Sequence, residues 1–475
     1  MHPILFRIPL PHRPLMLWWA LALAAAVAIV YAVLAGRAKD RTSAVVGLVA
    51  SVVAIGAAAF YRHTSFEQEA LPIYSYGVML GMSLVVGWYL TLTLADRDGL
   101  PKEVMANCYV ITAISAVVGS RLLYIATNLE EFHLGSSTEA FQFADLFAFR
   151  RGGLAVYGGF LGGYLASWAY LRPHGIRLMP WADVAVPSLA SGLFITRIGC
   201  YLFGCDFGKR LDDDAPGFLQ KIGTFPHWTG EAVAAGDGSP AYARHLDLYK
   251  GTPLAAQLTK MGHSFPVHPT QIYESLCGLF LVGLLLYQRK SQKFRGQIFF
   301  TFAFGYGYLR FLLEVLRDDA ERGEYGPSLA EHVLLPGALL AMSLAFIFGI
   351  ARSIKSPVAR MAARGIALVP PLAAYIILKP PTFGSSVTIQ LSTSQWIGLV
   401  TALVVSYFYA QFWEGARKQP TTSMSPASLG PGVERLAEEA REEAKTRQSE
   451  AEGDEGGDDE KEGAAGDRAE LPESP

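Results

Sequence analysis

The sequence LMLWWALALAAAVAIVYAVLA, residues 15–35, decides the fold class. It contains no charged side chain, and about 20 apolar residues in helical form cross the roughly 30 Å hydrocarbon core of a bilayer. A second apolar run follows at once, so we interpret the first as a retained helix and not as a cleaved signal peptide. Because only helices and closed barrels satisfy backbone polar groups in lipid, such runs predict a helical membrane protein.

Composition and hydropathy extend this prediction to the whole chain. Its 475 residues are 51% hydrophobic and only 17% charged, whereas soluble domains carry about 25% charged residues. We therefore predict an all-α fold, a polytopic transmembrane helical bundle of about eleven spans. The predicted spans lie near residues 15–35, 43–60, 73–94, 105–126, 153–171, 181–203, 270–287, 297–316, 332–351, 364–378 and 394–413.

Basic residues in the short loops predict the orientation of these helices. They gather in alternate loops, and the preference of Lys and Arg for cytoplasmic loops places all of these loops in the cytoplasm. The N-terminus is then outside and the C-terminus is cytoplasmic. The basic loops lie within residues 37–41, 97–102, 172–177, 289–295 and 352–364.

Two long segments lie outside the predicted spans. Residues 204–269 form one outside loop, which is long enough for a small extracytoplasmic head. The segment 414–475 is of low complexity, and from Glu434 onward it has 16 acidic and 6 basic residues. We expect this acidic cytoplasmic tail to be disordered, because it cannot bury a core.

Charged side chains within the spans are the main sign of function. Such groups are costly in lipid and tend to mark functional sites, although a single one is equally well explained by snorkelling to the interface. The predicted orientation places all of them, with several polar residues, near the outer face, which favours one shared site. The residues concerned are Tyr76, Arg121, Tyr157, Arg197, Gln271, Glu274, Arg310, Glu314 and Arg317.

The spacing of these residues indicates what the site binds. Arg310, Glu314 and Arg317 are spaced i, i+4 and i+7 and therefore share one helix face. Several arginines in a partly dry pocket favour an anion, and a phosphate suits their planar donors. Nearby glycines permit either close helix approach or access of a ligand to backbone N–H groups. We infer a site for an anionic lipid or lipid-linked substrate in the outer leaflet.

At this point the sequence resembles the prolipoprotein diacylglyceryl transferase family. Six segments are similar to family motifs, in the same order and with compatible spacing. They are Tyr76-Gly77, VVGSRLLYI at 117–125, RRGGLAVYGGFLGG at 150–163, GLFITRIGCYLFGCDFGKR at 192–210, HPTQIYES at 268–275 and YGYLRFLLEVLRDD at 306–319. The resemblance implies a seven-helix core, preceded by two additional helices and followed by two more.

The resemblance divides the chain into four segments. Residues 1–72 hold the first two helices, and 73–351 form the transferase-like core with its head at 204–269. Residues 352–413 hold two further helices, and 414–475 form the tail. The implied location is the inner membrane of a bacterium, with the active site toward the outer leaflet.

The family reaction transfers a diacylglyceryl group from phosphatidylglycerol to the lipobox cysteine of a prolipoprotein and releases glycerol phosphate. The implied catalytic residues are Arg197 and Arg310, which would stabilise the leaving phosphate, together with Glu314 and Tyr157. The implied substrate-binding residues are Tyr76, Arg121, Gly158, Gly159, Gly208, Gln271, Glu274 and Arg317. The expected partners are phosphatidylglycerol, the prolipoprotein lipobox peptide and the membrane; we expect no metal, no cofactor and no nucleic acid.

The sequence also departs from the family pattern. Tyr157 stands where the family has a histidine, the signature asparagines are Cys200 and Phe203, and the signature glutamate falls at Cys205. A divergent or catalytically silent paralogue that binds anionic lipid is therefore one alternative, and a transporter is another. Cys200 and Cys205 form a disulfide, contribute a reactive thiol or pack as small side chains.

Overall fold

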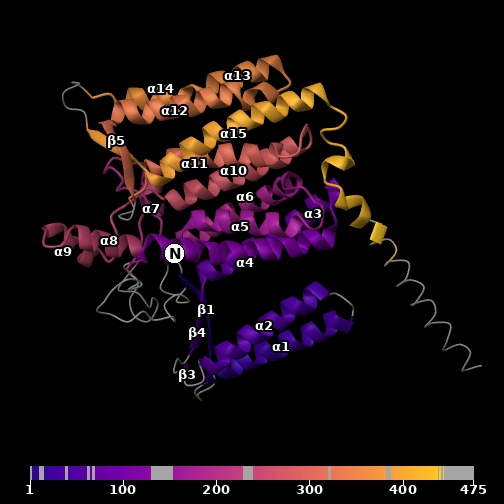
Figure 1. Cartoon of the computed structure of the whole chain (residues 1–475). Helices are drawn as coiled ribbons and strands as arrows, with labels where there is room; N and C mark the ends of the chain where they lie inside the picture. Colours follow the sequence, from indigo (N-terminus) through magenta and orange to yellow (C-terminus); the bar gives the residue numbers. More distant parts are fainter. Residues whose placement is uncertain are drawn as a thin grey trace, which may run out of the picture. The chain divides into compact units, whose positions relative to one another are not determined.

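The computed structural model describes most of the chain, and we discuss only those parts (Figure 1). The described residues divide into two units, each of which is treated by itself. The first unit consists of residues 1–79, 202–205 and 224–265, and the second consists of 80–201, 206–223 and 266–475. The described ranges are 3–9, 15–37, 41–60, 65–66, 70–129, 153–227, 239–318, 323–380 and 387–436, with residues 438, 439 and 442.

The first unit contains a helical hairpin of α1 (Leu17–Arg37) and α2 (Arg41–Phe60). Gly47 of α2 lies against Ala32 of α1, so closely that a Cβ atom on the glycine would be 2.8 Å from the alanine Cβ. The unit also has two antiparallel strand pairs, β1 (Ile4–Pro9) with β4 (Ala70–Tyr74) and β2 (Leu15–Met16) with β3 (Ser65–Phe66).

Two short helices of the first unit fall in the predicted head, α8 (Pro240–Leu248) and α9 (Pro253–Met261). The Ser239 side chain caps α8, and both helices begin with proline, whose missing N–H costs nothing in a first turn. Tyr242, Leu258 and Phe265 form their small apolar core.

The second unit is a set of long helices, most of which run side by side in Figure 1. Each of the eleven predicted spans of the chain overlaps helical structure. Seven described helical segments are long and apolar enough to cross a membrane, so the prediction of an all-α polytopic membrane protein is confirmed. The long helices that contribute to this unit are α3 (Ser75–Asp98), α4 (Lys102–Thr127), α5 (Val156–Leu171), α6 (Leu178–Phe203), α10 (Thr270–Arg289), α11 (Gln297–Glu314), α12 (Glu331–Phe348) and α15 (Thr393–Lys418).

The predicted span at 364–378 differs in detail from the structure. The structure has a broken helix here, which consists of α13 (Pro357–Ala367) and α14 (Val369–Leu378). The predicted span covers the end of α13 and all of α14. Pro370 and Pro371 explain the break, since proline lacks the donor that a continuous helix needs but fits in a first turn. The two halves together, Pro357–Leu378, are apolar enough to form one span.

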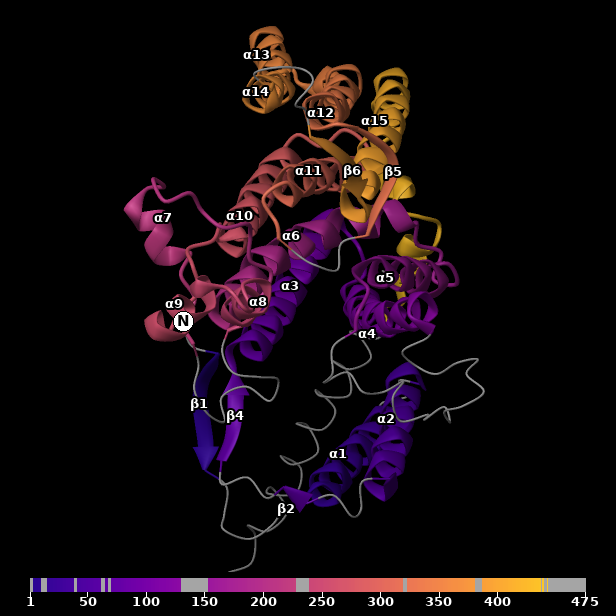
Figure 2. The same cartoon turned by 90° about the vertical axis from the view of Figure 1, so that its left-hand side faces the viewer.

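Small strands are the part of the fold that the sequence did not predict. In the second unit β5 (Glu324–Ala330) pairs with β6 (Thr388–Ser392), and β6 leads directly into α15 (Figure 2). The strand β5 contains Gly326 and Pro327, which interrupt any periodic pattern, and its partner lies about sixty residues away. The pairing fixes where α15 begins.

A second polar cluster, at the opposite helix ends from the predicted site, was also missed. Asp183 near the start of α6 is fully buried and accepts backbone N–H bonds from Gly296, Ile298 and Phe299 at 2.6–3.0 Å. It therefore caps α11. Close to the same level, Asp98 binds Arg289 at 2.7 Å and Arg295 at 2.8 Å, which ties α3 to the α10–α11 turn.

Candidate active site

Three arginines and three carboxylates form one connected network in the second unit. Arg197 comes from α6, Glu274 from α10, and Arg310 and Glu314 from α11; Asp206 follows α6 and Arg317 follows α11. Because α6 and α11 end where α10 begins, three alternating helices bring their charged ends together. The sequence predicted the convergence of five of these six residues, and it missed the sixth.

Glu274 is the centre of the network. One carboxylate oxygen, Oε1, accepts hydrogen bonds from Arg310 Nη1 at 2.6 Å and from Arg317 Nη1 at 3.2 Å. The other oxygen, Oε2, forms an ion pair with Nε of Arg197. The side chain is only 4% exposed. An ionised carboxylate this deep in a protein is stable only because three guanidinium groups face it.

Asp206 is the site residue that the sequence analysis left out. Its Oδ2 atom pairs with Arg197 Nη1 at 2.5 Å, and its Oδ1 atom pairs with Arg317 Nη2 at 2.7 Å. Its φ of 58° lies in the left-handed region, where residues other than glycine are uncommon except Asn and Asp. Thr270 Oγ1 donates to its backbone carbonyl at 2.6 Å and helps to hold this conformation. One signal was available, since Asp206 directly follows Cys205, where the resemblance implies the family's signature glutamate.

The charge of Asp206 follows from these contacts. Burial by itself would raise the pKa of this carboxyl group, but the positive charges of Arg197 and Arg317 outweigh burial and lower the pKa to about 2. Asp206 is therefore ionised throughout the physiological range. Its side chain is 34% exposed, so it is the most accessible of the carboxylates in the network.

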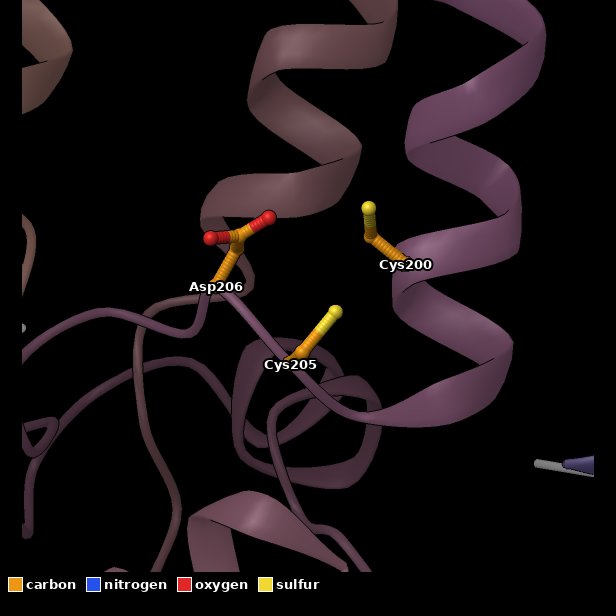
Figure 3. Close-up of side chains that lie close together, drawn as sticks. All are labelled: Cys200, Cys205 and Asp206. Carbon is orange, nitrogen blue, oxygen red and sulfur yellow. The ribbon is translucent and has the colours of Figure 1, made fainter. Parts of the chain in front are cut away.

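Cys200 lies one helical turn beyond Arg197, and Figure 3 shows its thiol on the same side of α6 as the Asp206 carboxylate. The Arg197 Nη1 atom is 3.9 Å from the Cys200 sulfur. None of the four cysteines of the chain is in a disulfide, so the structure contains Cys200 and Cys205 as thiols. Thiolates and carboxylates are common metal ligands, but both Asp206 oxygens are already engaged by arginines.

Glu314 extends the network away from Glu274. Its Oε2 atom pairs with Arg310 Nη2 at 2.9 Å, which confirms the predicted i, i+4 pair. Its Oε1 atom accepts a hydrogen bond from Ser392 Oγ at 3.1 Å. Arg310 therefore lies between two carboxylates, Glu274 and Glu314, which fix the orientation of its guanidinium plane.

Two further predicted residues lie beside the network at the start of α10. Gln271 is fully buried, one helical turn before Glu274. Gly208 pairs with Arg317 in an isolated antiparallel bridge and donates its N–H to the His268 carbonyl at 2.9 Å. A Cβ atom at Gly208 would lie 2.5 Å from the Leu316 carbonyl oxygen, so only glycine fits there.

Tyr157 is half buried in the first turn of α5. Its hydroxyl donates a hydrogen bond to Ser394 Oγ of α15 at 3.3 Å. Tyr306 of α11 lies one turn before Arg310 and lines a small cavity together with Glu274 and Arg310. Tyr306 is thus a further residue beside the network that was not predicted from the sequence.

A small cavity lies where Glu274 and Arg310 meet. The cavity has a volume of about 10 Å³, roughly enough for one water molecule. Apart from Glu274, Arg310, Tyr306 and Cys277, its walls are leucines of α6, α10 and α11. The charged network thus has an apolar side.

Arg121, Gly158 and Gly159 lie at the contact of α4 with α5. Arg121 is buried and donates to the Gly153 carbonyl at 2.9 Å. A Cβ atom at Gly158 would overlap the backbone of Gly119, and one at Gly159 would be 2.7 Å from the Ser120 hydroxyl oxygen. Of the two roles that the sequence allowed for these glycines, these contacts correspond to close helix approach.

The remaining predicted residue, Tyr76, is 41% exposed in the first turn of α3. It belongs to the first unit, whereas the charged network belongs to the second. The part of the RRGGLAVYGGFLGG motif before Gly153 and the tail beyond residue 442 lie outside the described residues.

The network as a whole is close to neutral, since three arginines face three carboxylates. Between the two polar levels of the bundle, the sequence has no charged residue from 184 to 196 in α6, from 275 to 288 in α10 or from 298 to 309 in α11. A transport pathway needs polar groups through the full depth of the membrane. In these three helices the charged side chains lie toward the two ends and none lies between them, so they form no continuous charged pathway. This disfavours the transporter alternative.

Long apolar helices with a buried charged network at one level define a multi-pass membrane protein with a built polar site. Comparison with known proteins identifies its family. Residues 63–353 match the model of the prolipoprotein diacylglyceryl transferase family, so the chain belongs to this family of transferases, as its motifs predicted. The matched range encloses the predicted core, 73–351.

Individual relatives agree with this assignment. The chain is 32% identical over 244 residues to a phosphatidylglycerol–prolipoprotein diacylglyceryl transferase of Thermus thermophilus, across 51% of this chain and 79% of that protein. Proteins of the same name from Bacillus cereus and Bacillus anthracis are 28% identical over 276 residues, across 58% of this chain and 87% of each relative.

Proposed function

We propose that this chain transfers a diacylglyceryl group from phosphatidylglycerol to the lipobox cysteine thiol of prolipoproteins and releases glycerol phosphate. The observation that supports it most is the convergence of Arg197, Arg310 and Arg317 on one buried network. Three guanidinium groups suit a phosphate, and fixed positive charge in a water-poor site stabilises negative charge that develops on it.

The proposed reaction is a displacement at a glycerol carbon. The sulfur of the lipobox cysteine forms a bond to the carbon that carries the phosphate ester, and the carbon–oxygen bond to the phosphate breaks. The electron pair of that bond passes to the phosphate oxygen, and the thiol proton passes to a base. Glycerol phosphate leaves, and the product is a thioether.

Without substrate, the three arginines are paired with carboxylates. A substrate phosphate therefore has to displace one of these carboxylates in order to bind. Asp206 is the carboxylate best suited to leave, because it is the most exposed of the three and bridges Arg197 and Arg317. In our proposal the substrate phosphate takes this bridging position. Glu274, which is far more deeply buried, remains in place and holds all three arginines.

In this scheme the thiol proton passes to Glu314, Glu274 or water. The Tyr157 hydroxyl donates its hydrogen to Ser394 Oγ at 3.3 Å, and we do not assign Tyr157 the role of a base. We assign it the donation of a hydrogen bond at the edge of the site. In this proposal Gln271 and Gly208 form the wall of the substrate site near Glu274 and Arg317. The wall of the site at the α4–α5 contact is formed by Arg121, Gly158 and Gly159.

The proposed orientation follows the charge bias of the loops. The N-terminus is outside, the C-terminus is cytoplasmic, and the network lies toward the outer leaflet of the bacterial inner membrane. Charged ends of α6, α10 and α11 meet at the level that this orientation assigns to the outer face. A thiol-specific reagent that does not cross membranes tests this proposal: it should label a cysteine introduced at Asp213 from outside the cell, and labelling only after lysis would contradict the orientation.

The function is tested by complementation. A bacterial strain depleted of its own transferase should grow when this chain is expressed, and mass analysis of a lipoprotein N-terminus should find the diacylglyceryl group on cysteine. Arg310→Ala should abolish transfer, whereas Asp213→Asn, a change on the exposed loop after α6, should not. A normal rate in Arg310→Ala would contradict the phosphate-binding role. Expressed, membrane-inserted protein with no transfer would indicate a silent, lipid-binding family member.

A further inference from the structure

Two side chains that contact the proposed site come from outside the region that matches the family. The match ends at residue 353, yet Ser392 binds Glu314 and Ser394 binds Tyr157. Both serines lie at the junction of β6 and α15, in the helices that follow the core. Sequence comparison with the family therefore does not reveal them.

Three features fix this junction in place. Ser392 is paired with Glu324 in the β5–β6 ribbon. Ser392 and Gln395 also form a capping box at the start of α15, with Gln395 N–H bonded to Ser392 Oγ at 3.2 Å and Ser392 N–H bonded to Gln395 Oε1 at 3.0 Å. In addition, Gly398 lies against Gly307 of α11. The serines are thus held by backbone pairing and helix packing.

The capping box also determines what the Ser392 hydroxyl does. A serine hydroxyl has one hydrogen and two acceptor lone pairs. Since the Gln395 N–H occupies a lone pair, the hydrogen remains for Glu314 Oε1, 3.1 Å away. This bond fixes one oxygen of Glu314, and the other oxygen pairs with Arg310 at 2.9 Å. Ser392 is only 4% exposed, so no bulk water replaces the bond.

Ser394 forms the second hydrogen bond between the junction and the core, with Tyr157. The tyrosine hydroxyl donates to Ser394 Oγ at 3.3 Å, and both side chains are partly buried. Tyr157 stands at the family's histidine position, and Ser394 comes from the additional helices. Tyr157, which departs from the family pattern, is therefore hydrogen-bonded to α15, which lies outside the region that matches the family.

We propose that the β6–α15 junction is part of the active site, with Ser392 positioning Glu314 and Ser394 positioning Tyr157. The proposal rests on the function proposed above, because it assigns the two serines to that reaction. Neither serine touches the reacting atoms in this scheme. Each keeps a polar side chain of the core in the orientation that the reaction uses.

Rates of transfer test the roles of the serines. Ser392→Ala and Ser394→Ala should each lower kcat about tenfold, the order expected for one hydrogen bond, and leave KM for phosphatidylglycerol within about twofold. Ser394→Thr keeps a hydroxyl and should restore the rate. Ser406→Ala is the matched control, because Ser406 is a buried serine of the same helix whose Oγ makes no hydrogen bond among the described residues. It should leave kcat unchanged.

Loss of helix capping has to be separated from loss of positioning. Gln395→Ala removes the reciprocal half of the capping box but leaves the Ser392–Glu314 bond. It should lower the melting temperature as Ser392→Ala does, with a much smaller loss of kcat. A double-mutant cycle serves the same purpose for the second pair. Tyr157→Phe and Ser394→Ala should be strongly non-additive, because each removes the same bond.

The outcomes distinguish failure of this inference from failure of the proposed function. Normal kcat in both serine-to-alanine variants of a transferring wild type would overturn the inference alone. A photoreactive p-benzoylphenylalanine at position 157 provides a readout without activity: irradiation should cross-link it to the peptide that contains Ser394. Cross-links to other segments only would overturn the inference. A cross-link to the Ser394 peptide in this variant, together with no transfer by the wild type, would overturn the proposed function and leave the contact standing.

Discussion

Gly307 of α11 and Gly398 of α15 face each other almost backbone to backbone. A Cβ atom on Gly398 would lie 2.8 Å from the Gly307 carbonyl oxygen, and one on Gly307 would lie 3.1 Å from the Gly398 carbonyl oxygen. Small residues permit such approach between membrane helices. Gly307 is one turn before Arg310, so this contact joins α15 to the helix that carries Arg310 and Glu314 of the proposed site.

Gly398→Val should therefore separate α15 from α11. We expect a lower melting temperature in detergent, by several degrees, and a fall in transfer rate, because β6 and its serines move with α15. Gly283→Val in α10 is the control, since nothing lies within 4 Å of its Cβ position. Equal melting temperatures for the two variants would show that the glycine contact contributes nothing to stability.

Asp206→Asn should strengthen binding of the anionic product. The change removes the negative charge that bridges Arg197 and Arg317, so glycerol phosphate no longer competes with a carboxylate. We expect a severalfold lower dissociation constant, measured by calorimetry on purified protein. Asp213→Asn is the matched control, because the Asp213 side chain is 94% exposed and pairs only with Arg210 at the surface. Weaker binding in Asp206→Asn would contradict the displacement step.

The lowered pKa of Asp206 predicts how the stability of the folded protein changes at acidic pH. The folded protein holds the pKa of Asp206 at about 2, below its ordinary value of 3.8. Its ionised form therefore contributes stability above pH 3.8, and this contribution is lost as the pH falls toward 2. Melting temperatures measured across this range should fall more steeply for the wild type than for Asp206→Asn. Parallel curves would show that the arginine contacts do not lower the pKa in solution.

Substitutions of Tyr157 test the departure from the family pattern. Tyr157→His should retain transfer, because histidine is the residue that the resemblance implies at this position. Tyr157→Phe should reduce transfer because it removes the hydroxyl. Initial rates with phosphatidylglycerol and a lipobox peptide provide the measurement. Full activity in Tyr157→Phe would remove the Tyr157 hydroxyl from the mechanism.

Gly158→Val distinguishes packing from substrate binding. A Cβ atom at this position would lie 2.6 Å from the Leu123 Cβ and would overlap the Gly119 backbone. We expect loss of folded protein, seen as low yield and early elution in size-exclusion chromatography. Wild-type stability combined with a raised KM would instead support the direct substrate contact that the sequence predicted.

The helices were predictable because their information is local. A run such as 15–35 specifies a membrane-spanning helix, because a helix of that many apolar residues is long enough to cross the hydrocarbon core of a bilayer. The Arg310–Glu314 pair was equally local, since i, i+4 spacing alone brings the two side chains together. The convergence of Arg197 and Glu274 also followed from simple alternation, because neighbouring helices run in opposite directions.

The other contacts depend on pairing between distant residues. The β5–β6 ribbon joins residues about sixty positions apart, and Ser392 meets Glu314 across 78 positions. Asp206 was missed for a different reason: its role depends on a left-handed backbone that turns its carboxylate toward two arginines. Asp183, which lies within a predicted span, was missed although a buried acid there required a partner.

The division of charge among three helices has a consequence for biogenesis. As described, α11 is not among the seven helices apolar enough to cross a membrane, and it carries Arg310 and Glu314 near its end. Arg310 pairs with Glu274 of α10, and Glu274 pairs in turn with Arg197 of α6. Both α6 and α10 leave the ribosome before α11. The earlier helices thus supply a polar docking site before α11 arrives, and lateral entry of α11 into the bilayer becomes an assembly step that depends on them.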